Sequence, residues 1–264
     1  MLSLVIKHLL RCLSLCLPLV MASCQATTPL ESPPWQGNAA GSQSWLGKFG
    51  LFTVYGAESD LEVTSPLTGD SLIEASLDTE MIGRGGIGGG YQHFLRDDFA
   101  LLVSLEARYT DAVITDPPLT VGGKEVFIPG DVLQFQGTIG GRYWLPVQWG
   151  REGRLRPFLG IDLNYIPETN FDLLANLNDT ISIDSEFKGS AYWTLGLCLG
   201  LSYQWTEDIT VHFTAFYEKG LSPSEDVVYL PIPGVDPSFI PPYPTNTSVD
   251  AEGLIGFLSL NWGF

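Results

Sequence analysis

Apolar and polar side chains alternate with a period of two along eight segments between Trp45 and Phe264. This period is typical of β-strands, because successive side chains of a strand point to opposite faces. The lengths of the segments suit tilted strands that cross a bilayer, which need roughly 9 to 11 residues. The segments are 45–55, 81–94, 99–110, 132–145, 156–165, 191–205, 209–218 and 251–264.

The connections between these segments alternate between short and long. Three are short turns, at 95–98, 146–155 and 206–208. The other four are long and are polar or rich in proline, and they lie near 56–80, 111–131, 166–190 and 219–250. Short turns on one side and long loops on the other are typical of outer-membrane barrels, whose turns are periplasmic and whose loops are extracellular.

One face of the strands is apolar and the other carries the charges. In the third, fourth, sixth and seventh segments, no odd-numbered position is charged, whereas the even-numbered positions include most of the polar residues. A charge that faces lipid at the bilayer midplane costs roughly 2 to 4 kcal/mol, so the charged face must be the lumen. The pattern predicts an all-β fold, an eight-stranded antiparallel up-and-down transmembrane β-barrel. The titratable side chains expected in its lumen are Arg84, Glu106, Arg108, Arg142, Asp162, His212 and Glu218.

Aromatic residues cluster near the strand ends, as in the girdles that membrane proteins place at the two bilayer interfaces. One girdle is expected next to the long loops and the other next to the short turns. The first consists of Tyr55, Tyr109, Tyr143, Tyr165 and Tyr217, and the second of Trp205, Trp262 and Phe264.

The last strand ends with Leu258, Leu260, Trp262 and Phe264 at alternate positions. This ending resembles the recognition signal of outer-membrane barrels, which the barrel-assembly machinery reads. Together with the strand count and the loop pattern, it makes residues 45–264 similar to the small bacterial outer-membrane β-barrels, a class that includes the OmpA barrel, OmpX, OmpW and the opacity-type proteins. The resemblance implies a location in the bacterial outer membrane, in contact with its lipid and lipopolysaccharide, and it says less about activity.

The first residues, 1–23, are typical of a secretory signal peptide. Lys7 and Arg11 supply positive charge, and an apolar core follows at 13–21. The junction around Cys24 resembles a lipoprotein cleavage site, which would make this cysteine a candidate for lipidation; ordinary signal cleavage near Ala26 is the alternative.

Residues 24–44 are rich in proline and small polar residues and lack apolar periodicity, so a flexible periplasmic tether is expected there. Cys12 and Cys16 lie in the signal and Cys24 at its end, which leaves Cys198 as the one cysteine of the barrel. An internal disulfide and a Cys/His metal site are therefore not expected.

The net charge of −17 excludes nucleic acid as a partner, because phosphates require basic surfaces. The glycine-rich run at 83–90 is followed by no helical pattern, so it is no dinucleotide loop. No cofactor is expected.

The charged residues of the lumen could be a catalytic group or a structural network. The interior of eight strands is filled by side chains, and buried charges there must pair, so the network is the favoured interpretation. His212, in Val211-His212-Phe213-Thr214, resembles the His and Ser pairing of outer-membrane lipid A deacylases only weakly, because Thr214 stands where that family has serine. The protein is not expected to be an enzyme.

Six carboxylates in the first long loop share the numbering parity of the lumen, which predicts a protruding hairpin with a candidate cation ring at the extracellular mouth. Divalent cations with oxygen ligands would relieve repulsion between these like charges. An acidic surface that merely adds solubility is the alternative, and no firm metal site is expected. The six are Glu58, Asp60, Glu62, Glu74, Asp78 and Glu80.

These features predict a non-enzymatic barrel with a structural or surface-interaction role, carried by its acidic and proline-rich extracellular loops. One alternative is a narrow, porin-like passage for small or apolar solutes, for which glycines would leave room in the lumen: Gly86, Gly88, Gly90, Gly196 and Gly200. A lipid A-modifying hydrolase is the other.

Overall fold

A computed structural model describes residues 40–116, 119–121, 124–126, 132–150, 153–178, 181–230 and 242–263. Eight strands form the barrel: β1 (Gln43–Thr64), β2 (Ser71–Arg96), β3 (Phe99–Asp116), β6 (Val132–Trp144), β7 (Leu155–Ile166), β10 (Tyr192–Gln204), β11 (Ile209–Gly220) and β13 (Tyr243–Gly263). The shorter strands are β4 (Leu119–Val121), β5 (Lys124–Val126), β8 (Thr169–Asn178), β9 (Ile181–Gly189) and β12 (Ser224–Leu230). Within these ranges, no helix is long and apolar enough to cross a membrane.

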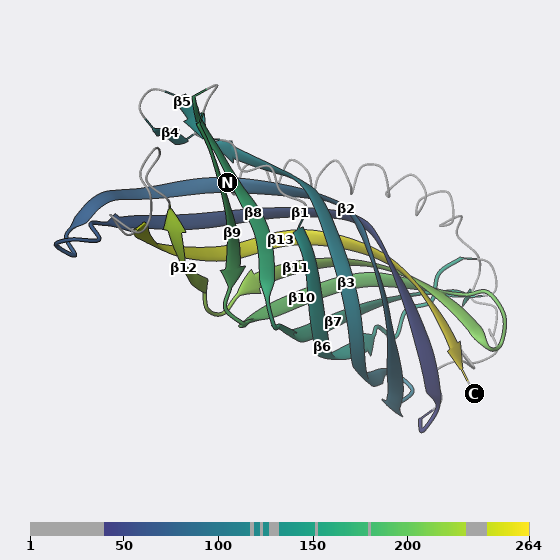
Figure 1. Cartoon of the computed structure of the whole chain (residues 1–264). Coiled ribbons are helices and arrows are strands. Elements are labelled where there is room, and N and C mark those ends of the chain that lie inside the picture. Colours follow the sequence, from purple (N-terminus) through teal and green to yellow (C-terminus); the bar gives the residue numbers. More distant parts are fainter. Residues whose placement is uncertain are drawn as a thin grey trace.

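The barrel is closed, and every neighbouring pair of its strands is antiparallel. The strands follow the order β3-β2-β1-β13-β11-β10-β7-β6, and β3 pairs with β6 to complete the ring (Figure 1). Neighbours in the barrel are neighbours in the chain, which is the up-and-down arrangement predicted from the sequence. All eight predicted segments are barrel strands.

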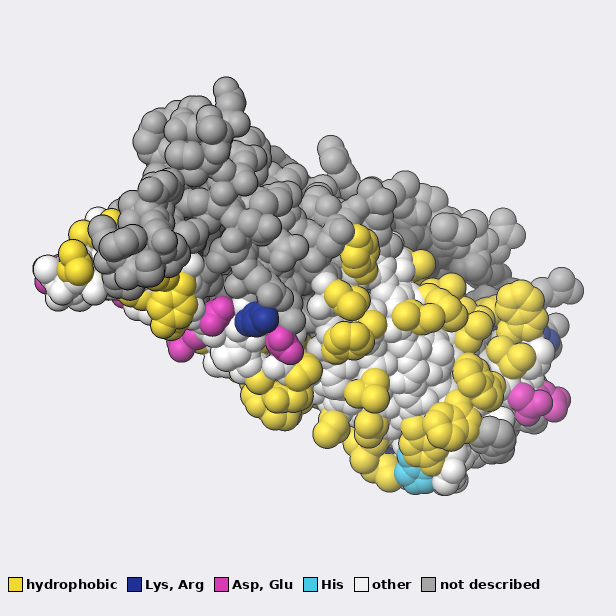
Figure 2. Space-filling view, in the orientation of Figure 1, with side chains coloured by type: hydrophobic (Ala, Val, Ile, Leu, Met, Phe, Trp, Pro, Cys, Tyr) yellow, Lys and Arg dark blue, Asp and Glu magenta, His cyan; other side chains and the backbone are white. Residues whose placement is uncertain are grey.

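The outer surface of the barrel carries the apolar face of each strand. Leu105 is 71% exposed, and Leu197 and Ile139 are also exposed, whereas the adjacent Glu106 is 4% exposed. Figure 2 shows these outward apolar side chains gathered over the barrel. The predicted facing of β3, β6, β10 and β11 is therefore confirmed. These outward apolar side chains form a lipid-facing belt, which is the surface that a lipid environment requires.

The girdles are confirmed in part. Tyr165 and Trp193 are in contact, with ring centroids 4.9 Å apart and planes tilted by 49°, at the end of the barrel that carries the long connections. The placement of Tyr143 next to the long loops was wrong: β6 runs toward the short turns, and Tyr143 lies opposite Phe99, the first residue of β3. It therefore belongs to the other girdle.

The sheet continues beyond the barrel, in agreement with the protruding hairpin that was predicted for the first long loop. β1 and β2 stay paired up to Thr64 and Ser71, and the turn between them is closed by hydrogen bonds between Ser65 and Asp70 and between Gly69 and Ser65. β13 pairs with β1 up to Val63 and also with β12. β8 and β9 form a second hairpin, which joins β6. The long loops thus contain paired strands, which the polar composition of these segments concealed.

Bulges in β1 and β2 reverse the facing of the strands where they leave the barrel. The register of β1 against β13 shifts between Gly50 and Phe52, and that of β2 against β3 shifts between Gly83 and Gly85. Ser44, Leu46 and Lys48 are buried at even positions of β1, whereas Thr53, at an odd position beyond the bulge, is buried. The extra residue in each strand exchanges its two faces.

This reversal corrects the expectation that the carboxylates of the first hairpin share the lumen side. Beyond the bulge the even positions of β1 lie on the outer face, and Asp60 is exposed there. Glu74, the neighbour of Ile73 on β2, is also exposed and pairs in register with Glu62. Asp60 and Glu74 therefore lie on the outside of the extension rather than at its mouth.

Candidate functional site in the barrel lumen

Four buried charged side chains form an ion-pair cluster in the middle of the lumen. Arg108 pairs with Glu106, and its Nη1 lies 2.8 Å from Oε2 of Glu218. The Nζ of Lys48 lies 3.5 Å from Oε2 of Glu106 and donates to the hydroxyl of Ser104 over 2.8 Å. Two cations face two carboxylates, so the cluster is electrically balanced. Such pairing is what makes buried charges tolerable.

Neutral side chains extend the cluster across the lumen. Thr194 donates to Oε1 of Glu218, and the amide of Asn164 donates to the same oxygen over 3.2 Å. Thr138 in turn donates to Asn164 over 2.9 Å. Side chains from β3, β6, β7, β10 and β11 are thereby joined, which supports a structural role for the network.

A second ion pair joins β6 to β7. The guanidinium of Arg142 binds both carboxylate oxygens of Asp162, at 2.5 and 2.7 Å. The charged end of Arg142 lies 5.3 Å from the centre of the Phe216 ring. Gly160 makes room for this pair, because a Cβ there would lie 2.7 Å from Nη1 of Arg142.

The sequence identified most of the lumen charges correctly but missed Lys48 and Arg156. Glu106, Arg108, Arg142, Asp162, His212 and Glu218 are all buried inside the barrel. Lys48 was missed, although its even position between Leu46 and Gly50 on β1 signals the lumen face. Arg84 falls at the bulge of β2, and its side chain lies outside the described residues.

An aromatic layer fills the lumen beside the ion pairs, which the expectation of a polar interior did not include. Trp144 is fully buried, and its ring centre lies 5.1 Å from that of Phe94 and 5.5 Å from that of Phe158. Phe216 and Phe257 meet edge to face at 5.6 Å. These rings form the core of the barrel together with Ala100, Cys198 and Ile255.

Four of the five glycines expected to leave room in the lumen do not leave open space. Only at Gly196, among these five, would an added Cβ make ordinary van der Waals contacts. A Cβ at Gly88 would lie 2.7 Å from both the Leu105 carbonyl and the Glu106 Cβ, and one at Gly200 would collide with the ring of Phe158. Gly86 and Gly90 are similarly crowded by β3. The glycines serve close contact between strands and side chains, so the room expected for a solute is absent at these four positions.

Arg156 closes the barrel at the end with the short turns. Its guanidinium donates to three backbone carbonyls, those of Leu145 at 2.9 Å, Asp97 at 3.2 Å and Trp144 at 3.3 Å. One side chain thereby ties together two of the turns at this end.

His212 is held in the aromatic layer by a chain of hydrogen bonds. The indole of Trp144 donates to the hydroxyl of Ser202 over 2.8 Å, and this oxygen lies 2.9 Å from Nδ1 of His212. Ser202 is 0% exposed. A Ser–His pair buried in this way is out of reach of an acyl chain in the bilayer.

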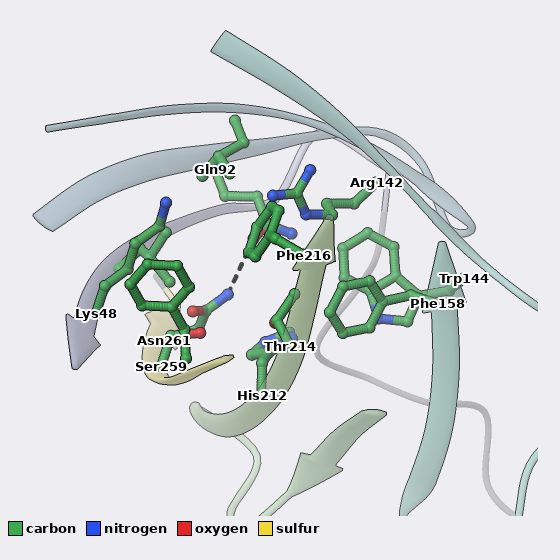
Figure 3. A pocket seen from close by; sticks show the side chains of 13 residues that line it. Lys48, Gln92, Arg142, Trp144, Phe158, His212, Thr214, Phe216, Ser259 and Asn261 are labelled. Atoms are coloured by element: carbon green, nitrogen blue, oxygen red, sulfur yellow. Dashed lines mark hydrogen bonds between the residues drawn. The ribbon is translucent and has the colours of Figure 1, made fainter. Parts of the chain in front are cut away.

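Between the ion pairs and the aromatic layer lies a small pocket of about 20 Å³ (Figure 3). Its walls include the side chains of Lys48, Gln92, Arg142, His212 and Asn261. A cavity of this size holds roughly one water molecule.

Several predicted sites lie wholly or partly outside the described residues. These are the lipidation candidate Cys24, most of the proline-rich stretch of the fourth long loop, Phe264, and the side chains of Glu58, Asp78 and Glu80. The rest of the terminal signal, Leu258, Leu260 and Trp262, is part of β13 and pairs with β1 and β11. The described residues contain no group of three His, Cys, Asp or Glu side chains that could hold a metal ion.

No family model matches the chain, and no curated protein is significantly similar to it in sequence. Among solved structures, the outer membrane protein OprG from Pseudomonas aeruginosa matches with a TM-score of 0.55 at 18% identity, over 87% of this chain and 98% of OprG. The outer membrane protein AlkL, solved in lipid bilayers, matches with a TM-score of 0.43 at 16% identity, over 91% of this chain and 96% of AlkL. The match to OprG, the closed ring of strands and the outward apolar belt show that this chain has the fold of the small bacterial outer-membrane β-barrels, in agreement with the predicted location in the outer membrane.

Proposed function

We propose that the protein is a non-enzymatic outer-membrane barrel with a closed lumen, which acts at the cell surface through the part of its sheet that extends beyond the membrane. The observation that carries this proposal is the filled interior. The cluster of Lys48, Glu106, Arg108 and Glu218 lies above an aromatic layer, and the pocket between them measures about 20 Å³. A passage for solutes requires a far wider opening than the single water that fits this volume.

Conductance across a planar bilayer tests the closed lumen. The wild-type protein should give no discrete conductance steps, because paired charges and rings occupy the lumen. The variant Arg108→Ser/Glu218→Ser removes both partners of one buried pair, so it trims the plug without leaving a single unpaired charge. We expect short openings from this variant. Discrete steps from the wild-type protein would refute the proposal in favour of a pore.

Neighbouring strands of the extension carry carboxylate residues at the same level. The register places Asp250, Glu58, Asp78 and Asp116 side by side on β13, β1, β2 and β3. Like charges in direct cross-strand positions destabilise a sheet. Cations that neutralise these carboxylates would therefore stabilise the sheet.

The height of these residues on the barrel suggests their partner. The hydroxyl of Tyr217, in the girdle, donates to Glu252 over 2.9 Å. Asp250 precedes Glu252 by two residues on β13, on the side away from the barrel. The acidic face therefore begins directly above the bilayer interface, at the level of the lipid headgroups. Lipopolysaccharide carries phosphates in this layer, and divalent cations with oxygen ligands join phosphates to carboxylates. This supports a surface role in which the extension binds lipopolysaccharide through such cations.

Binding of lipopolysaccharide with and without Mg²⁺ tests this role. The variant Glu58→Gln/Asp78→Asn/Asp250→Asn, which changes three of the carboxylate residues that the register places side by side, should bind lipopolysaccharide several-fold more weakly than wild type in Mg²⁺, and chelation should remove the difference. The matched control is Glu207→Gln/Asp208→Asn, which changes exposed acids in the turn at the opposite end of the barrel. Equal loss in both variants, or binding unaffected by chelation, would contradict the role of the extension.

A further inference from the structure

Three polar side-chain atoms of residues that line this small pocket have no hydrogen-bond partner among the described residues. They are Nε2 of Gln92 on β2, Nε2 of His212 on β11 and Oδ1 of Asn261 on β13. All three residues are buried, and all three border the same pocket (Figure 3). A buried polar atom without a partner costs about 1–3 kcal/mol. Three of them around one cavity point to a bound molecule that satisfies them.

The amides of Gln92 and Asn261 present one donor and one acceptor to this molecule. Asn261 donates through Nδ2 to Oε1 of Gln92 over 3.0 Å, which leaves Nε2 of Gln92 and Oδ1 of Asn261 unmatched. Exchanging the oxygen and nitrogen of both amides reverses the bond and again leaves one donor and one acceptor. The requirement therefore does not depend on the amide orientation.

His212 adds a second donor. The indole nitrogen of Trp144 can only donate, so the oxygen of Ser202 accepts from it. The hydroxyl of Ser202 can then donate its own proton to Nδ1 of His212, 2.9 Å away, which gives this buried O–H group an acceptor. An imidazole that accepts at Nδ1 carries its proton on Nε2 when it is neutral. The Nε2–H group is thus a donor at the edge of the pocket.

The charged side chains around the pocket already have partners. Lys48 is bound by Ser104 and Glu106, and Arg142 is bound by both oxygens of Asp162. The unmatched atoms are therefore neutral, two donors and one acceptor. An anion would leave the acceptor unmatched, whereas water can accept two hydrogen bonds and donate one in return.

We propose that one ordered water molecule occupies the pocket and bridges Gln92, His212 and Asn261. The volume of about 20 Å³ suits a single water, and buried waters have on average about three hydrogen bonds. The water links β2, β11 and β13 across the lumen. The space between the aromatic layer and the ion pairs is then filled by a hydrogen-bonded water and is not a packing defect.

Nuclear magnetic resonance of the folded protein in detergent micelles, with labelled histidine, tests the water directly. The proton on Nε2 of His212 should show magnetisation transfer to a long-lived water, and Nδ1 should be unprotonated. Thr214 borders the pocket, and Thr214→Leu should abolish the transfer by filling the space. The control is Thr245→Leu, at a buried threonine of β13 in the extension, sixteen residues from Asn261 in the chain, which should retain the transfer.

The absence of transfer in the wild-type protein, or its persistence in Thr214→Leu, would overturn the proposal. Exchanging chloride for sulfate in the buffer provides a measurement that needs no variant. Unchanged His212 ring signals are expected for water. A shift of these signals between the two salts would mean that an anion occupies the pocket instead.

Discussion

The two partners of the Arg142–Asp162 ion pair should be strongly coupled, so that the losses of stability from removing each partner alone add up to far more than the loss from removing both. The two side chains are 6% and 1% exposed, and they share two hydrogen bonds. Breaking a buried pair by removing one partner costs about 3–5 kcal/mol, because the remaining charge stays buried without compensation. Asp162→Asn and Arg142→Met should each lose a free energy of unfolding in this range.

The double variant tests the reasoning behind this magnitude. Arg142→Met/Asp162→Asn contains no uncompensated charge, so its loss should be smaller than the sum of the single losses by at least about 2 kcal/mol. Urea unfolding in lipid vesicles, followed by tryptophan fluorescence, measures these values, since Trp144 is buried beside Arg142 in the lumen. Losses that add to within about 0.5 kcal/mol would refute the coupling.

An exposed pair in the same protein supplies the control for this cycle. Lys219 and Glu252 lie 3.8 Å apart with side chains that are 59% and 32% exposed. Exposed ion pairs contribute about 0–1 kcal/mol, so Lys219→Met and Glu252→Gln should couple weakly. A coupling as large as that of the buried pair would show that burial is not the cause.

Two further substitutions test the packing of the lumen and the lipid-facing belt. Gly88→Ala should lower the free energy of unfolding by about 1–3 kcal/mol, because its Cβ would overlap the backbone of β3. The adjacent Gly89→Ala, whose Cβ would meet only the carbonyl of Leu46 at 3.6 Å, should be tolerated, and equal losses in urea unfolding would contradict this. Leu105→Arg should cost about 2–4 kcal/mol in lipid vesicles, because Leu105 lies in the belt near the middle of β3. Leu72→Arg, exposed near the tip of the extension, should cost little in the same assay, and a comparable loss would argue against the assigned membrane level.

The barrel strands were predictable because lipid and lumen impose opposite polarity on alternate residues. β10 illustrates this: Leu195, Leu197 and Leu199 are exposed, while Thr194 and Ser202 on the other face are buried. The strands extend further than predicted because pairing continues beyond the bilayer, where lipid no longer selects apolar side chains. β1 therefore runs on to Thr64 through a stretch whose composition alone suggests a loop.

The content of the lumen was predicted only for its polar and charged residues. Trp144, Phe158 and Phe216 occupy the lumen positions of their strands, but an interior taken to be polar gave no reason to place them there. The closed interior of eight strands is narrow enough for side chains to exclude water, so aromatic rings are as suitable there as in a soluble core. The ion pairs lie beside these rings, as the contact of Arg142 with Phe216 shows.

The bulges explain why the acidic residues could not be placed from numbering alone. One extra residue in β1 and in β2 at the same level exchanges the faces of both strands while keeping them paired. Glycine makes this possible: Gly85 adopts a φ of 147°, and a Cβ on Gly50 would lie 3.0 Å from the carbonyl carbon of Gly85. Without the bulges, the carboxylates would converge on a narrow mouth and repel one another at close range. With them, Asp60 and Glu74 are exposed on the extension, where solvent and cations screen the repulsion, so local backbone irregularities determine which side of the extension can meet a partner.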